Sequence, residues 1–172
     1  MRCALPALLL ALAACSRGSA PALDERLLLA LEEARAWQHR ADVHLIDGNA
    51  AGAVDDVEQV LRIQFPKGVA EGEEARLDAW ARLARLHLSA SEAAEDRALA
   101  DVERGRAEAT RDSFYRAHLE TVAGEILEAR AARLATVDAV RARAARQQAL
   151  ETYARSIAIN QRVQAALRRE AP

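Results

Sequence analysis

The sequence contains few aromatic residues, glycines and prolines. Of its 172 residues, 3% are aromatic although 51% are apolar, and there are only seven glycines and four prolines. β-Sandwiches and barrels favour aromatic and β-branched residues, so this composition argues against them. Alanine, leucine, arginine and glutamate dominate instead, and all four are strong helix formers. Residues 125–171 hold neither glycine nor proline. We therefore predict an all-α fold.

Cysteine is also scarce, and both copies lie in the first 15 residues. Met1 and Arg2 precede an apolar stretch, Leu5 to Ala14, which is too short for a transmembrane helix of about 20 residues but suits the core of a signal peptide. The stretch ends in Leu12-Ala13-Ala14-Cys15. This ending resembles the lipobox of bacterial lipoproteins, in which small residues precede a cysteine. An ordinary secretory signal that happens to contain a cysteine is the alternative.

The resemblance implies that signal peptidase cuts before Cys15 and that the thiol of Cys15 carries diacylglycerol. We therefore expect a signal peptide at 1–14, a short tether at 15–22 and a helical domain at 23–172. Two or three acyl chains anchor a protein stably. Ser16 stands where an aspartate tends to retain lipoproteins at the inner membrane, so the resemblance implies an outer-membrane location facing the periplasm.

Lysine is almost absent: Lys67 is the single lysine, against 23 arginines. The net charge of −2 argues against a general nucleic-acid binder. The charge is unevenly distributed, because residues 15–128 have a net charge of −9 and residues 129–172 have a net charge of +6. Either the two parts pack through complementary surfaces, or the basic C-terminal third contacts an anionic surface such as lipid or cell wall.

Apolar residues with helical spacing predict a series of helices. The first follows Asp24 and ends at Asp47-Gly48-Asn49, where Gly48 suits the left-handed end of a helix and Asn49 suits the next N-cap. The second stops before Phe65. Further helices are expected at about 73–88, at about 92–109 with a capping box from Ser89 to Glu92, and after Asp112 or Ser113. We expect a break at 136–138 and a last helix carrying Leu150, Tyr153, Ala154 and Ile157.

An internal repeat links two of these helices. Residues 36–45 (AWQHRADVHL) and 79–88 (AWARLARLHL) share five of ten residues at a period of 43. Such periods are typical of stacked helix pairs. The shared tryptophan, alanine and histidine make the sequence similar to tetratricopeptide repeat proteins. The resemblance implies about three stacked antiparallel helix pairs in a solenoid, although its period is longer than that family's 34 residues. A plain helical bundle is the alternative.

In that family the first helix of each pair lines a concave groove that binds protein partners. Carried over to this sequence, the groove positions are Arg35, Gln38 and Asp42 in the first unit, Ala81 and Arg85 in the second, and Arg116 and Glu120 in the third. An ordinary solvated helix face is the alternative interpretation of these residues. The family's lysine and asparagine clamp for chaperone C-termini is not matched, since Gln38 and Asp42 occupy those places.

The sequence contains no catalytic or metal-binding motif that we can identify. His44 and His87 occupy equivalent repeat positions and are interpreted as structural, and His39 and His44 do not have the i, i+4 spacing of metal ligands. No phosphate-binding glycine loop or nucleophile elbow occurs. We therefore predict no enzyme, no cofactor and no metal.

Two functions follow from these patterns. The first is a membrane-anchored adaptor that binds another envelope protein through its helix pairs. The second is a structural tether whose basic C-terminal third contacts cell wall or lipid.

Overall fold

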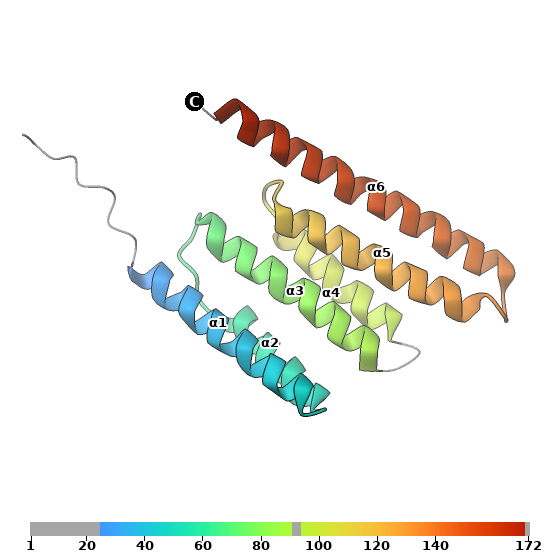
Figure 1. The fold of residues 1–172 in the computed structure, drawn as a ribbon, viewed down its shortest axis with the longest axis horizontal. Coiled ribbons are helices and arrows are strands. Elements are labelled where there is room, and N and C mark those ends of the chain that lie inside the picture. The colour runs from blue at the N-terminus through green and yellow to red at the C-terminus, as the bar shows by residue number, and fades with distance from the viewer. Residues whose placement is uncertain (1–24, 91–93, 171–172) are drawn as a thin grey trace, which may run out of the picture.

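The computed structural model describes residues 25–90 and 94–170, and this part of the chain contains six helices and no strands (Figure 1). The all-α prediction is confirmed. The helices are α1 (Glu25–Ile46), α2 (Ala50–Arg62), α3 (Ala70–Ala90), α4 (Glu95–Glu108), α5 (Phe114–Leu134) and α6 (Ala139–Glu170). The predicted signal peptide, Cys15, the tether and Glu92 of the expected capping box lie outside the described residues.

The helix ends lie close to where local sequence signals predicted them, except at the start of α4. Ser89, expected to cap that helix, lies inside α3 and donates to the Leu86 carbonyl, and α4 begins at Glu95 without a side-chain cap. Gly48 has a φ of +75°, the left-handed conformation that glycine adopts without steric cost. Asn49 caps α2 by accepting a hydrogen bond from the Gly52 N–H at 3.0 Å, and Ser113 caps α5 by accepting one from the Arg116 N–H at 3.1 Å. The predicted break before Ala139 is also present.

Consecutive helices pack against each other as three pairs, α1 with α2, α3 with α4, and α5 with α6. Figure 1 shows α1, α3 and α5 running in one direction and their partners returning. The first pair also contacts α3, and α4 contacts α5, so α3 and α5 join the pairs into one body.

Two hydrophobic cores meet at α3. One lies among the first three helices and includes Val57, Val60 and Leu83, and the other lies among α3, α4 and α5 and includes Leu119 and Ile126. Trp80 packs against both cores. Because each core draws residues from two successive pairs, no pair encloses a core of its own, as in stacked-repeat proteins.

The repeated residues of the first two pairs occupy similar environments. Ala41 and Ala84 are fully buried, which lets neighbouring helices approach closely. Each repeated histidine faces an aspartate on the second helix of its pair: His44 Nε2 lies 3.6 Å from Asp56, and His87 Nδ1 lies 2.5 Å from Asp101. Both histidines therefore contact carboxylates inside the fold.

The last helix buries a different face from the one that its largest apolar residues predicted. Leu150 and Ile157 are 64% and 57% exposed, so their expected inward position is wrong. The buried positions of α6 alternate by three and four residues: Ala142, Ala145, Ala149, Thr152, Ser156 and Ile159. This is the heptad spacing of a coiled coil. Small side chains let α6 pack closely along α5, and that close contact takes precedence over burial of isolated large residues.

Four of the nine arginines of the basic C-terminal third pair with the acidic part of the chain. Arg133 binds Glu95 at 2.7 Å and Arg162 binds Asp112 at 2.6 Å. Two similar ion pairs join Arg130 to Asp96 and Arg155 to Glu120. The uneven charge is thus used in part for internal packing.

Candidate protein-binding face

Helices α1, α3 and α5 lie side by side and present one polar face, which we call the α1–α3–α5 face. Gln38 Nε2 donates to Asp78 Oδ2 at 3.0 Å, and Arg82 forms an ion pair with Asp42. In both contacts the two residues are 40 positions apart in the sequence. This is the length of chain between facing positions on α1 and α3. The contacts fix α1 laterally against α3.

The same separation recurs between α3 and α5. Arg85 binds Glu125 through two hydrogen bonds of 2.9 Å, from Nε and from Nη2. Its third nitrogen, Nη1, lies 3.1 Å from His118 Nε2. Burial and the charge of Arg85 lower the pKa of His118, so the neutral imidazole accepts from the guanidinium. A ladder of polar contacts therefore crosses all three helices.

A hollow of about 290 Å³ opens on this face. Its lining comes from all three helices and combines apolar with polar side chains: Leu31, Ala34, Arg35, Gln38, Glu71, Glu74, Ala75, Asp78 and Tyr115. Recognition sites commonly combine apolar area with a few placed polar groups in this way.

The hollow is predominantly acidic. Glu71, Glu74 and Asp78 contribute carboxylates, whereas Arg35 is the one basic residue in its lining. Arg35 is itself bound to Glu32 at 2.6 Å, outside the hollow. Burial, followed by the charges of Asp78 and Glu74, raises the pKa of Tyr115. The hollow is therefore suited to cationic groups and hydrogen-bond donors, with the ring of Tyr115 available for cation–π contact.

The structure brings four of the seven predicted groove residues to this face. Arg35 and Gln38 line the hollow, while Asp42 and Arg85 lie along the polar ladder beside it. Sequence reasoning missed Asp78, His118 and Glu125. Facing positions on neighbouring first helices are 40 residues apart, and this spacing could have identified them. The sequence repeat has a period of 43 residues, which selects positions almost one helical turn further along.

The predicted positions in the third unit lie elsewhere. Glu120 is 6% exposed and is held between Arg106 of α4 at 2.5 Å and Arg155 of α6 at 3.1 Å. Arg116 binds Asp112 at 3.0 Å, and that aspartate also binds Arg162 of α6. Ala81 is buried, at 1% exposed. These three residues are used for contacts within the fold. The family's groove spacing, carried over to α3 and α5, selected sides of these helices that do not form the α1–α3–α5 face.

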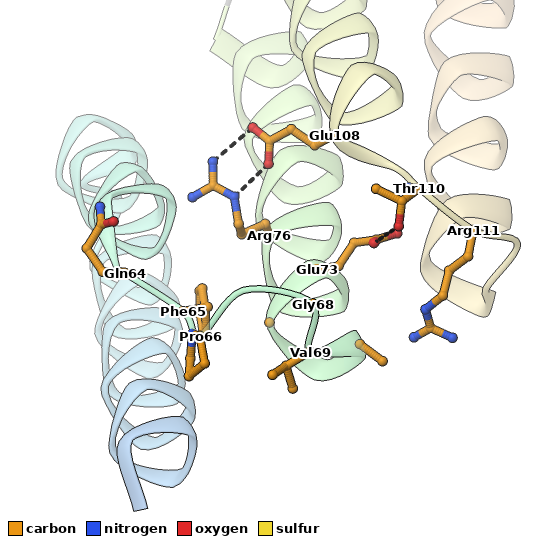
Figure 2. A pocket seen from close by; sticks show the side chains of 12 residues that line it. Gln64, Phe65, Pro66, Gly68, Val69, Glu73, Arg76, Glu108, Thr110 and Arg111 are labelled. Carbon is orange, nitrogen blue, oxygen red and sulfur yellow. Dashed lines mark hydrogen bonds and ion pairs between the residues drawn. The ribbon is translucent and has the colours of Figure 1, made fainter. Parts of the chain in front are cut away.

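A second, larger hollow of about 560 Å³ lies at one end of the helices, between the α2–α3 and α4–α5 loops (Figure 2). Arg76 at its base donates to Glu108 at 2.6 and 2.9 Å and to the Leu61 carbonyl at 2.5 Å. Trp80 donates to the same glutamate at 3.0 Å, and these bonds outweigh burial to lower the pKa of Glu108. The charged groups here are used for structure, so the hollow offers little for ligand recognition.

Within residues 25–90 and 94–170, no cluster of three histidine, cysteine or acidic side chains could hold a metal ion. In the same residues no helix is long and apolar enough to cross a membrane.

No protein family profile matches the chain, and searches of curated proteins and of solved structures return no match. Function is therefore argued from the residues of this chain.

Proposed function

We propose that the protein is a lipoprotein of the cell envelope, anchored by lipid on Cys15, that acts as an adaptor through tetratricopeptide-like helix pairs. It resides at the outer membrane, faces the periplasm and binds an envelope protein on the α1–α3–α5 face. The observation that carries the proposal is the acidic hollow on this face, which the first helices of three successive pairs build together.

The chemistry of the hollow indicates the kind of partner. The lining combines apolar side chains with three carboxylates. Glu74 is paired with Arg111 and Asp78 accepts from Gln38, whereas Glu71, exposed in the first turn of α3, has no ion pair with a described residue. A partner segment with lysine or arginine beside apolar residues complements this lining in both charge and polarity. The ion pairs of Arg82 and Arg85 hold the three helices in place, so binding requires little rearrangement.

The alternative of a tether that uses the whole basic C-terminal third is less well supported. Four arginines of that third are bound to carboxylates on α4, α5 and the loop between them. They are not available to an external anion without loss of those pairs.

Site-specific photo-crosslinking in cells tests the adaptor. A photo-reactive amino acid at Arg35 should give one discrete crosslinked protein, whereas the same group at Arg116, away from the face, should give none. Glu71→Lys should reduce the Arg35 crosslink at least about tenfold, the effect of a 1.4 kcal/mol loss of binding. Glu58→Lys on α2 makes the same charge change away from the face and serves as the matched control.

Two outcomes would contradict the proposal. Equal crosslinking at Arg35 and Arg116 would mean that the face is not a specific site. If Cys15→Ala left the protein fully membrane-bound, the lipid anchor would be wrong, whatever the crosslinks show.

A further inference from the structure

Several chain segments meet at one end of the domain, which we call the anchor end. Thr110 of the α4–α5 loop donates its N–H to Glu73 at the start of α3, at 2.9 Å. Asp112 of the same loop binds Arg162 near the end of α6, at 2.6 Å. Figure 1 shows the start of α1 at this same end. The anchor end thus combines the start of α1, the α2–α3 and α4–α5 loops, and the last turns of α6.

Apolar side chains are displayed at the anchor end. Phe114 and Leu167 are each 62% exposed, although both are large and apolar. Phe65, Pro66 and Val69 form the apolar rim of the end hollow and are half-buried (Figure 2). These residues come from one loop and two helices, so they gather through folding and not through one apolar run of sequence.

Polar groups beside these apolar residues are satisfied within the protein. Arg76 is bound to Glu108 and to a backbone carbonyl, and Glu73 is bound to Thr110. These paired groups would not be left without partners in a less polar medium, whereas the unpaired charges at this end, Glu71 among them, would have to stay among the polar headgroups.

Three cations flank the apolar group, together with the exposed acids Glu71 and Glu170. Lys67 is exposed in the α2–α3 loop, and Arg168 and Arg169 lie in the last turn of α6. None of the three forms an ion pair with a described residue. Since Arg162 lies beside Asp112, just before α5 begins, the last turns of α6 extend past α5 by about 12 Å. Aromatic and apolar side chains flanked by basic ones are suited to the headgroup region of a bilayer.

We propose that the anchor end is a membrane-contacting surface, and that Phe114, Leu167 and the rim of the α2–α3 loop dip into the bilayer that holds the lipid anchor. This inference rests on the proposed lipidation of Cys15. Ten peptide links separate Cys15 from Glu25, so α1 begins within about 35 Å of the acyl chains even if the link is fully extended. The anchored domain then stands with its helices pointing away from the membrane and the α1–α3–α5 face open to the side.

Environment-sensitive labels on introduced cysteines test this orientation. In the lipidated protein the thiol of Cys15 is alkylated and Cys3 has left with the signal peptide, so an introduced cysteine is the single free thiol. Phe114→Cys and Leu167→Cys would carry a fluorescent label at the anchor end. Ile46→Cys and Val137→Cys are the matched controls, because Ile46 is 84% and Val137 is 77% exposed at the opposite end.

The labelled proteins are reconstituted in vesicles of phosphatidylethanolamine and phosphatidylglycerol, some of which contain nitroxide-labelled lipid. We expect the labels at 114 and 167 to shift to shorter emission wavelengths and to be quenched by the nitroxide. The labels at 46 and 137 should behave as they do in solution. Equal quenching at the two ends, or none at 114 and 167 in protein that floats with the vesicles, would overturn the inference while the lipid anchor stands.

Whether Cys15 carries lipid is measured separately, by the mass of the modified protein and by its flotation with vesicles. A second arm then tests the orientation without acylation. The chain from Ser16 onward, with an N-terminal hexahistidine tag, is bound to vesicles that contain nickel-chelating lipid, and the same four labels are compared. Loss of the difference between the ends in this arm would also overturn the inference.

Discussion

The first two helix pairs and the third are held together in different ways. In the first two, a tryptophan, a buried alanine and a histidine recur on the first helix, and each histidine meets an aspartate on the second. The third pair has no tryptophan or histidine in this arrangement and instead packs along a seam of small residues with heptad spacing. The same pair-on-pair architecture is thus reached through specific polar contacts in one region and through close helix approach in another.

The two histidine–aspartate contacts also differ from each other. The His87 and Asp101 side chains are 5% and 1% exposed. Asp56 is equally buried, but its partners Arg40 and His44 are 57% and 32% exposed. The hydrogen bond from Arg40, more than its charge, lowers the pKa of Asp56. Asp101 also binds an exposed arginine, Arg104, at 3.1 Å, so the two contacts differ at the histidine: water reaches His44 and does not reach His87.

The largest expected effect comes from breaking the buried contact. Asp101→Ala should lower the free energy of unfolding by about 3 kcal/mol, because it leaves a buried imidazole without its partner. His87 Nε2 already has no hydrogen-bond partner among the described residues, so the ring would lose its remaining bond. Asp56→Ala should cost clearly less, since Arg40 and His44 can be rehydrated. Urea unfolding followed by circular dichroism at pH 7 measures both.

Asp101→Asn provides the control for this comparison, because the amide keeps an acceptor for His87 in nearly the same volume. It should recover part of the loss. Equal losses for Asp101→Ala and Asp56→Ala would show that burial of the second contact contributes nothing to stability.

A smaller loss of stability is expected when a glycine at each of the two kinds of helix contact is replaced by alanine. In α4, a Cβ on Gly105 would lie 2.7 Å from Leu119 Cδ2 and 3.0 Å from the Cβ of Trp80. Leu119 is fully buried and the tryptophan Cβ is fixed by its backbone, so neither can yield. Gly105→Ala should therefore cost about 2 kcal/mol through overpacking, despite the better helix propensity of alanine.

Gly124 in the α5–α6 seam should respond differently. A Cβ there would lie 2.5 Å from Cε1 of Tyr153, but that ring is half-buried and its end can swing toward solvent. The ring would give up its hydrogen bond to Glu128, 2.8 Å long, while the helix gains propensity. Gly124→Ala should therefore be neutral to within about 1 kcal/mol. Thermal unfolding of the two variants makes the comparison, and a Gly124→Ala loss as large as that of Gly105→Ala would contradict it.

Local signals in the sequence were sufficient for the helix ends but not for the faces of the last helices. Gly48, Asn49 and Ser113 were predicted because capping depends on residues within one turn. The buried face of α6 was not, since alanine occurs on several of its sides and Leu150 and Ile157 suggested the wrong one. Only the close approach of α5 selects the small-residue face.

The candidate site divides in the same way. Arg35 and Gln38 were placed on the α1–α3–α5 face because the repeat motif around Trp37 is clear. Arg116 and Glu120 were misplaced, because the third unit lacks that motif and its orientation depends on how α5 packs against α3, α4 and α6. The contribution of Glu71 and Asp78 to the acidic hollow required two helices to be placed side by side. No spacing within either helix encodes it.

The smallest effect on stability should come from the third helix pair, at high pH. Both tyrosines of the chain lie in α5 and α6, whereas both tryptophans lie in α1 and α3, so tyrosinate absorbance and tryptophan fluorescence report on different regions. Burial, followed by the hydrogen bond and charge of Glu128, raises the pKa of Tyr153 to about 12. A tyrosine in the unfolded chain ionises near pH 10. The folded state thus holds the proton more tightly, and this contribution to stability is complete below pH 10 and is lost as the pH rises toward 12.

We expect tyrosinate absorbance to appear at a higher pH than it does for free tyrosine. The urea concentration at the midpoint of unfolding should fall over the same pH range. Tyr153→Phe should reduce that fall, leaving the smaller contribution of Tyr115, whose pKa is also raised. An ionisation midpoint near 10 for both tyrosines would show that the seam is open to water. If tryptophan fluorescence changes together with the tyrosine signal, the three pairs unfold as one unit; if it lags, the seam of small residues opens before the pairs that carry the histidine–aspartate contacts.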